Sequence, residues 1–237
     1  MTEPAVSEPA VTEQAATGTG PSNGTVKAVW TDFGGVLTPS ISKTLLDFCA
    51  STNVPPEPLV KAMVKVAASY GTDDIMLPID TPLVTEEEWT RQIREILRVD
   101  YQVTMQLTTL ADVWFGGRET NEAWADRLRQ VRASGVFVGM LSNMVPAWDV
   151  HWRRMVDPDE LFDDVVLSFE VGCRKPQQEI FALAAARAGV RPEESVFVDD
   201  LAKNCAGAAA AGWQTIHFTD TAAAISRLDE LLSPVEH

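Results

Sequence analysis

The sequence predicts an α/β protein in which a doubly wound parallel sheet carries an inserted α-helical unit. After residue 24, short Val-rich apolar runs alternate with amphipathic helical patterns, which is typical of a parallel sheet covered by helices on both faces. Residues 40–115 contain helical patterns and no strand signal of comparable strength. The chain has 237 residues, 46% of them hydrophobic, which is enough for one α/β core plus a smaller unit.

The strands of the predicted sheet are short runs rich in Val, Ile and Phe. We predict them at residues 26–31, 136–141, 165–168, 195–198 and 215–218. Amphipathic segments separate them, and we predict core helices at residues 122–133, 176–188, 202–211 and 221–232. Pro176 suits the first position of its helix, because proline lacks the N–H that a helix start leaves unbonded.

The rest of the chain divides into a tail and an insertion. Residues 1–24 contain no Lys, Arg or aromatic side chain, so we predict a disordered tail. The insertion contains three predicted helices, at residues 43–51, 57–69 and 85–97. Thr85 is the expected N-cap of the last one, because Glu88 follows it three residues later. We therefore predict an α/β core of residues 25–39 and 116–237 with an α-helical cap of residues 40–115.

Composition disfavours several classes of partner. The formal net charge of −15 argues against nucleic acid and against anionic membrane surfaces, since both are bound through clustered Lys and Arg. No apolar run reaches the roughly 18 to 20 residues that cross a bilayer, and the N-terminus does not resemble a signal peptide. The three cysteines are widely spaced and form no C-x-x-C pair. We expect a cytoplasmic protein, as a monomer or a homodimer.

Polar residues follow three of the predicted strands at the point where each strand ends. They are Asp32, Ser142, Asn143, Asp199 and Asp200. Ligands of open parallel sheets bind beyond the carboxyl ends of the strands, so we expect these side chains to meet in one crevice. Lys175, just before a predicted helix, is expected to join them. Its positive charge opposes the helix dipole at that position, which favours a functional interpretation over a structural one.

These residue types suit phosphoryl transfer. Carboxylates are the oxygen ligands that Mg²⁺ prefers, and Asp32, Asp199 and Asp200 supply three of them. Lys175 offers a fixed positive charge, while Ser142 and Asn143 offer neutral hydrogen-bond donors. An aspartate surrounded by such groups is able to act as a nucleophile and form an aspartyl-phosphate.

The order of these motifs resembles that of the haloacid dehalogenase superfamily. The first motif is similar to Asp-Phe-Gly-Gly-Val-Leu-Thr at residues 32–38, and the second to Leu-Ser-Asn at residues 141–143. The third is similar to Arg-Lys-Pro at residues 174–176, and the fourth to Val-Asp-Asp at residues 198–200. The resemblance extends over residues 26–218. It implies a Rossmann-like core and the small α-helical cap known as the C1 type.

The resemblance also implies a role for each site residue. Asp32 is expected to be the nucleophile and, with the Gly34 carbonyl and Asp200, a ligand of Mg²⁺. Asp199 would assist the metal directly or through water. Ser142, Asn143 and Lys175 would bind the phosphoryl group of a small phosphorylated substrate, and Lys175 would also neutralise the nucleophile.

Gly34 departs from the pattern of most phosphatases in this superfamily. They carry a second aspartate there, which protonates the leaving oxygen. The variant Asp-x-Gly-Gly-Val resembles a subgroup that includes the phosphatase-like domains of soluble epoxide hydrolases and of acyl-CoA dehydrogenase fusions. Because general acid catalysis contributes about 10²- to 10⁴-fold, its loss favours substrates whose leaving groups depart readily. His151 is a conceivable substitute acid, but we expect it to be a packing or surface residue.

Two alternatives remain open at this stage. A dehalogenase-like hydrolase would use Asp32 to attack carbon and would need no metal; that branch of the superfamily also lacks the second aspartate. A catalytically silent relative would act by binding or regulation, and Gly34 is the feature compatible with it. The aspartate pair at residues 199 and 200 favours the Mg²⁺-dependent phosphatase.

Overall fold

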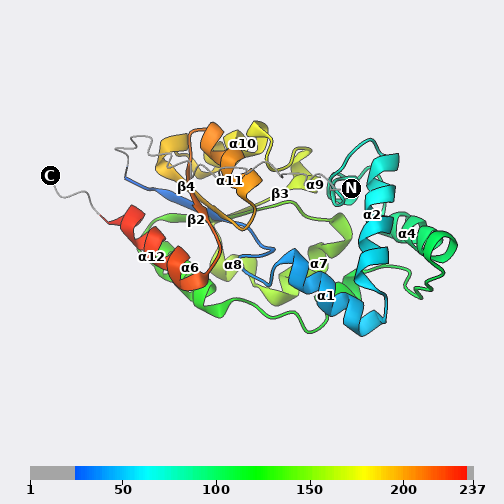
Figure 1. Ribbon diagram of the computed structural model, residues 1–237. Coiled ribbons are helices and arrows are strands. Elements are labelled where there is room, and N and C mark those ends of the chain that lie inside the picture. The colour runs from blue at the N-terminus through cyan, green and yellow to red at the C-terminus, as the bar shows by residue number, and fades with distance from the viewer. Residues whose placement is uncertain (1–24, 234–237) are drawn as a thin grey trace, which may run out of the picture.

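The computed structural model describes residues 25–233, which form a five-stranded parallel sheet flanked by helices (Figure 1). The strands are β1 (Ala28–Thr31), β2 (Phe137–Ser142), β3 (Asp164–Leu167), β4 (Ser195–Asp199) and β5 (Gln214–His217). Their order in the sheet is β3-β2-β1-β4-β5, and every neighbouring pair is parallel. The predicted doubly wound α/β fold is therefore confirmed, and each strand lies within two residues of its predicted bounds.

Both faces of the sheet are covered by helices. Helices α10 (Gln178–Ala188) and α11 (Ala202–Ala210) lie on one face, and α6 (Glu122–Ala133) and α12 (Thr221–Leu232) on the other (Figure 1). The predicted bounds of α6 and α12 are confirmed at both ends. Each begins at a local cap, because the side chains of Asn121 and Asp220 accept hydrogen bonds from the first turns of α6 and α12.

Aromatic side chains fill the core beneath α10 and α11. Trp30 of β1 packs against Trp213 with ring centroids 6.4 Å apart, and Phe181 packs edge-on against Phe197. Gly139 on the neighbouring strand β2 makes room for the indole, since a Cβ atom there would lie 2.5 Å from the Trp30 ring. The position of the Trp30 ring over β2 thus requires glycine at residue 139.

The predicted start of α10 at Pro176 was wrong. The helix begins at Gln178, and residues 174–177 form a turn closed by a 2.8 Å hydrogen bond from the Gln177 N–H to the Arg174 carbonyl. The Lys175–Pro176 peptide bond within this turn is cis. The turn therefore includes residues 176 and 177, where the sequence pattern predicts the first residues of the helix.

Five helices lie between β1 and α6 in the chain. They are α1 (Ile41–Thr52), α2 (Pro56–Ser69), α3 (Leu77–Asp80), α4 (Glu86–Tyr101) and α5 (Ala111–Phe115). The Thr85 hydroxyl accepts the Glu88 N–H, so the predicted cap of α4 is confirmed. Helices α2 and α4 pack together at the end of the molecule opposite α12 (Figure 1). The division into core and cap stays a prediction, and the predicted tail lies outside the described residues.

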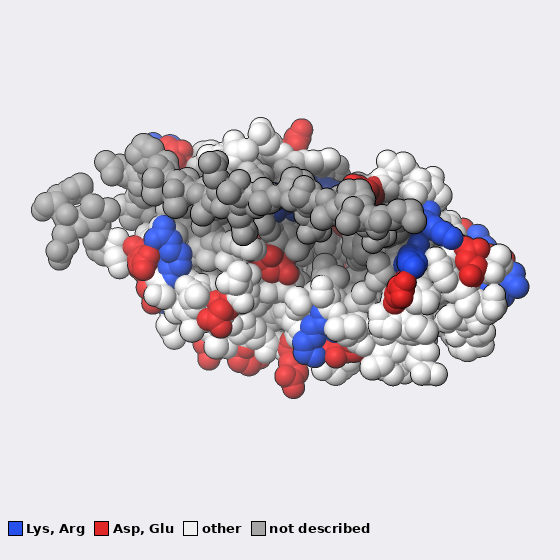
Figure 2. All heavy atoms as spheres, viewed as in Figure 1, with Lys and Arg blue, Asp and Glu red and all other residues white. Residues whose placement is uncertain are grey.

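Short helical segments that the sequence pattern did not resolve complete the structure. They are η1 (Pro146–Trp148), α7 (Asp149–Met155), α8 (Pro158–Leu161), α9 (Ser168–Val171) and η2 (Pro192–Glu194). Across residues 25–233, no helix combines the length and apolar character that a bilayer-spanning segment needs. On the face drawn in Figure 2, the described Lys and Arg side chains form small separate groups rather than one continuous patch.

Candidate active site

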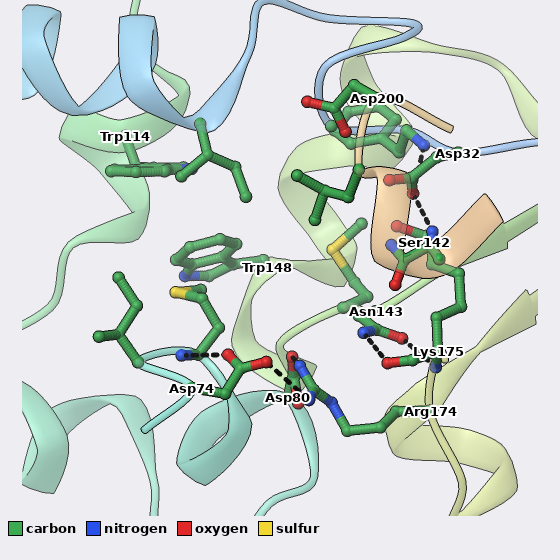
Figure 3. Close-up of a pocket in the computed structure, with 18 of the residues that line it drawn as sticks. Asp32, Asp74, Asp80, Trp114, Ser142, Asn143, Trp148, Arg174, Lys175 and Asp200 are labelled. Carbon is green, nitrogen blue, oxygen red and sulfur yellow. Dashed lines mark hydrogen bonds and ion pairs between the residues drawn. The ribbon is translucent and has the colours of Figure 1, made fainter. Parts of the chain in front are cut away.

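Three carboxylates and one lysine meet at the carboxyl edge of the sheet. Asp32 follows β1, Asp199 ends β4, and Asp200 is the next residue; one oxygen of each lies within 4.8 Å of the others. The Lys175 Nζ lies 2.9 Å from Asp32 Oδ1 and 2.6 Å from Asp199 Oδ2. We call these four residues the carboxylate centre; Figure 3 labels Asp32, Asp200 and Lys175. The sequence predicted this convergence, and the parallel topology produces it.

The loop after β1 shapes the surroundings of Asp32. The Phe33 N–H donates a 2.7 Å hydrogen bond to Asp32 Oδ1, and the Phe33 carbonyl accepts the N–H groups of Leu37 and Thr38. Gly35 has a φ of +84°, and a Cβ atom there would overlap the Asp200 carboxylate. Only glycine therefore lets the loop turn this closely over Asp200.

The two acidic residues after β4 have different surroundings. Asp199 is fully buried and accepts hydrogen bonds from Lys175 Nζ, the Leu201 N–H and the Asn204 amide. Asp200 is partly exposed and lines the pocket (Figure 3). The structure thus gives Asp199 the contacts of a residue that positions Lys175, and it leaves Asp200 accessible to a ligand.

Asn143 is bonded to the backbone of Lys175 in both directions. Its amide nitrogen donates to the Lys175 carbonyl at 3.0 Å, and its amide oxygen accepts the Lys175 N–H at 2.9 Å. This pair fastens the turn of residues 174–177 to the end of β2. Ser142 and Asn143 both line the pocket beside Lys175, as the sequence predicted.

Burial and mutual repulsion make the carboxylate centre electrostatically costly. Burial raises the pKa of Asp32 to about 7, against the attraction of Lys175. Burial, together with the charge of Asp199, raises the pKa of Asp200 to about 6. Burial alone would lower the pKa of Lys175, but Asp199 and Asp32 together raise it above its ordinary value. Three carboxylates against one ammonium leave an excess of negative charge that a bound cation would relieve.

A pocket of about 240 Å³ opens in front of the carboxylate centre. Much of its lining is apolar, with Phe33, Ile75, Met76, Trp114, Phe115 and Trp148 among the residues. The indoles of Trp114 and Trp148 are stacked with centroids 5.5 Å apart, across the pocket from Asp32 and Lys175 (Figure 3). His151 does not line the pocket; its ring stacks on Phe115 with centroids 5.3 Å apart.

A second group of charges lines the same pocket, and sequence reasoning missed it. Arg174 Nη1 lies 3.0 Å from Asp74, and Arg174 Nη2 lies 2.7 Å from Asp80. Lys203 Nζ is 3.0 Å from Asp74. We call Asp74, Asp80, Arg174 and Lys203 the ion-pair cluster; Figure 3 labels the first three. It joins the segment between α2 and α4 to the sheet side of the pocket.

Arg118 was also missed. It lies just after α5 and lines the pocket together with Asp32 and Gly34. Burial lowers the pKa of its guanidinium to about 10. No motif marked this residue, and its position became apparent only from the fold.

The structure defines a parallel α/β protein with an acidic pocket at the carboxyl edge of its sheet, and the comparisons identify the family. The sequence profile of the haloacid dehalogenase-like hydrolases matches residues 26–212. The chain belongs to this family, as the order of its motifs predicted.

Similar proteins of named function include several phosphatases. The chain is 29% identical over 209 residues to acyl-CoA dehydrogenase family member 10 of Mus musculus, covering 87% of this chain and 19% of the mouse protein. It is 34% identical over 106 residues to a sesquiterpene phosphatase of Aspergillus oryzae, covering 44% of this chain and 54% of that protein. It is 39% identical over 92 residues to a glyceraldehyde 3-phosphate phosphatase of Methanopyrus kandleri, covering 38% and 39%. The matches thus span between about a fifth and about half of these relatives.

Solved structures share the fold. A haloacid dehalogenase family enzyme from Bacteroides thetaiotaomicron, solved with magnesium, superimposes with a TM-score of 0.55 at 26% identity, covering 81% of this chain and 92% of that one. A dehalogenase with an intermediate complex gives a TM-score of 0.65 at 19% identity, covering 89% and 99%. The second similarity concerns the fold alone.

Proposed function

We propose that the chain is a Mg²⁺-dependent phosphatase whose nucleophile is the carboxylate of Asp32. The observation that carries the proposal is the carboxylate centre: a buried aspartate 2.9 Å from a buried lysine, with further carboxylates within 4.8 Å. The phosphatases among its relatives support a small phosphorylated substrate.

The residues present fit a magnesium ion. Asp32 and Asp200 would supply carboxylate oxygens and Gly34 its backbone carbonyl. Three carboxylates lie within 4.8 Å of one another beside one ammonium, so the site has an excess of negative charge that a divalent cation would offset. Asp199 is expected to act mainly through Lys175, which it holds at 2.6 Å. A bound Mg²⁺ would neutralise charge on the phosphoryl oxygens. The magnesium in the Bacteroides structure supports this choice of metal.

Each side chain of the site has a separate role in the proposed phosphoryl transfer. Asp32 attacks phosphorus in line, so that an aspartyl-phosphate forms as the bond to the leaving oxygen breaks. Lys175, buried and fixed by Asp199, holds its positive charge against Asp32 and the transferring phosphoryl group. Ser142 contributes its hydroxyl to the phosphoryl oxygens, and Asn143 contributes its remaining amide proton while it fixes the Lys175 backbone. Water then hydrolyses the intermediate.

The pocket favours an apolar alcohol that leaves readily. Gly34 offers no carboxyl group to protonate the leaving oxygen, so esters of acidic alcohols should react fastest. The aromatic wall around Trp114 and Trp148 suits an aromatic or other apolar group. The similarity to a sesquiterpene phosphatase supports an apolar organic part.

The test is phosphate release from a panel of aryl, acyl, sugar and alkyl phosphates, with Mg²⁺ and with EDTA. We expect turnover that EDTA abolishes and Asp32→Asn eliminates. Asp112→Asn, a change at a carboxylate whose side chain is 90% exposed, is the matched control and should be fully active. Comparable rates on alkyl and aryl esters would contradict the leaving-group preference.

The same assays separate the alternatives. Halide release from 2-haloacids that persists in EDTA would identify a dehalogenase-like hydrolase instead. Fluoroberyllate with Mg²⁺, a mimic of the aspartyl-phosphate, should raise the melting temperature of the wild type but not of Asp32→Asn. The absence of turnover and of this shift would favour a catalytically silent binding protein.

A further inference from the structure

Arg118 is held over the pocket by aromatic rings and a backbone carbonyl. Its guanidinium carbon lies 5.6 Å from the ring centroids of both Phe33 and Phe115. Its Nη2 donates a 3.1 Å hydrogen bond to the Pro39 carbonyl. These contacts orient the guanidinium and leave other N–H groups of the fork free to donate.

No carboxylate in the described part of the chain forms an ion pair with Arg118, and its buried Nε has no hydrogen-bond partner there. Arg174, in contrast, contacts two carboxylates in the same pocket. Arg118 is partly buried, and the Asp32 charge acts on it without forming an ion pair. A cation held in this way costs free energy, which an anion bound next to it would offset. The residue therefore points to an anionic ligand or to negative charge that develops in the pocket.

The space next to Arg118 is the space above Gly34. A Cβ atom built on Gly34 would lie 3.8 Å from Arg118 Nη2, the one atom within 4 Å of it outside the neighbouring residues. An aspartate at position 34 would project its carboxyl group into this same space. The guanidinium thus borders the place from which an acid at position 34 would reach the leaving oxygen.

We propose that Arg118 is a catalytic residue that stabilises the leaving oxygen in place of the missing acid. The inference rests on the proposed phosphatase function. As the Asp32 oxygen bonds to phosphorus, the electron pair of the breaking P–O bond goes to the leaving oxygen. Arg118 donates hydrogen bonds to that oxygen, which departs as an anion and takes its proton from water afterwards. Preorganised donors at developing charge act without solvent reorganisation, as in an oxyanion hole.

This role predicts a dependence on the leaving group. The charge on the leaving oxygen in the transition state matters most when the departing alcohol is a weak acid. Removing the guanidinium should therefore slow phenyl phosphate far more than 4-nitrophenyl phosphate. A residue that only binds the phosphoryl group would slow both esters equally.

The experiment measures kcat/KM with Mg²⁺ for substituted phenyl phosphates that span a range of leaving-group acidity. Arg118→Gln should lower the rate by about 10²-fold on phenyl phosphate, the typical cost of losing an oxyanion donor, and by less than about tenfold on 4-nitrophenyl phosphate. Arg118→Lys keeps the charge and should retain part of the rate. Arg153→Gln, at an arginine placed over Trp152, is the control and should match the wild type. Melting temperatures report whether each variant is folded.

Each outcome decides the proposal. A steeper dependence on leaving-group acidity in Arg118→Gln, with partial recovery in Arg118→Lys, supports it. An equal loss across the series overturns it and assigns Arg118 to substrate binding or structure. A loss seen only in KM, and only for phosphates that also carry a carboxylate, overturns it in favour of a subsite for a second anion. A wild type without turnover on any ester refutes the phosphatase itself, a failure distinct from the preceding two.

Discussion

The carboxylate centre and the ion-pair cluster line the same pocket, yet their charges balance differently. The first has three carboxylates and one ammonium; the second has two carboxylates, a guanidinium and an ammonium. In the ion-pair cluster, burial raises the pKa of Asp80 to about 6, while hydrogen bonds from Arg174 and Lys203 outweigh burial and lower that of Asp74 to about 2.

The difference in charge balance indicates which of the two groups is functional and which is structural. A balanced group of charges needs no further ion and holds segments together, although Asp80 Oδ1 and Arg174 Nε have no hydrogen-bond partner among the described residues. An unbalanced group has an unfavourable electrostatic free energy until a ligand supplies the missing charge. Such groups are typical of functional sites. Arg118 is also unbalanced, but here the excess charge is positive, because no described carboxylate forms an ion pair with it. The following predictions test the distinction, from the largest expected effect to the smallest.

Asp32→Asn should separate activity from stability most strongly. We expect kcat to fall by about 10⁴- to 10⁶-fold, because the nucleophile is lost. Stability should stay the same or rise, since the change removes one of three mutually repelling carboxylates. Phosphate release and urea unfolding measure the two effects. A large loss of stability would show that the charges of the carboxylate centre are balanced, which would contradict its proposed difference from the ion-pair cluster.

Lys175→Met should be the most destabilising change in the carboxylate centre. It leaves the fully buried Asp199 without its cation, and breaking a buried pair costs about 3–5 kcal/mol in unfolding free energy. Urea unfolding measures the loss. Lys203→Met is the control, because the Lys203 side chain is 54% exposed and should cost less than about 1 kcal/mol. Equal costs for the two lysines would refute the distinction.

In the ion-pair cluster, Arg174→Met should cost about 3 kcal/mol, because it removes the partner of the buried Asp80. Adding Asp80→Asn should restore part of that loss, since the double variant no longer buries an unpaired charge. Activity should change less than stability in both. If the double variant is no more stable than Arg174→Met, Asp80 is not the source of the cost.

The pH dependence of stability gives the smallest effect. The pKa of Asp80 is raised by burial from 3.8 to about 6 in the folded chain. The folded state therefore binds more protons in this range, so the unfolding free energy falls as the pH rises through it. Asp80→Asn removes this titration. Between about pH 4 and pH 6.5 the variant should gain about 2 kcal/mol relative to the wild type. A difference that is constant with pH would contradict the raised pKa.

The α/β core was predictable because its signals are local. Apolar runs marked β1 to β5, and the amphipathic patterns of residues 122–133 and 221–232 marked α6 and α12, which in the structure begin at the caps Asn121 and Asp220. The start of α10 was not predictable from local signals. The turn of residues 174–177 is bonded to Asn143, which lies 32 positions from Lys175. Short segments such as α7 have too few turns to show a period.

The candidate site divides in the same way. Asp32 and Asp199–Asp200 each follow a strand, so parallel topology alone brings them together. The contacts of Arg174 with Asp74 and Asp80 join residues 100 and 94 positions apart, and no motif marks either acid. Likewise, a sequence pattern could nominate Asn143 for phosphate binding but could not show that its amide is bonded to the Lys175 backbone. Contacts between residues that are far apart in the sequence produce no periodic pattern from which they could be predicted.

The stacked indoles of Trp114 and Trp148 give the pocket an optical property. Both rings are almost wholly buried and border the space a substrate would enter. Tryptophan emission is sensitive to polarity and to nearby quenchers, so a compound that displaces water from these rings should change the intrinsic fluorescence of the protein. Ligand binding in the pocket could then be measured by intrinsic tryptophan fluorescence, without a label.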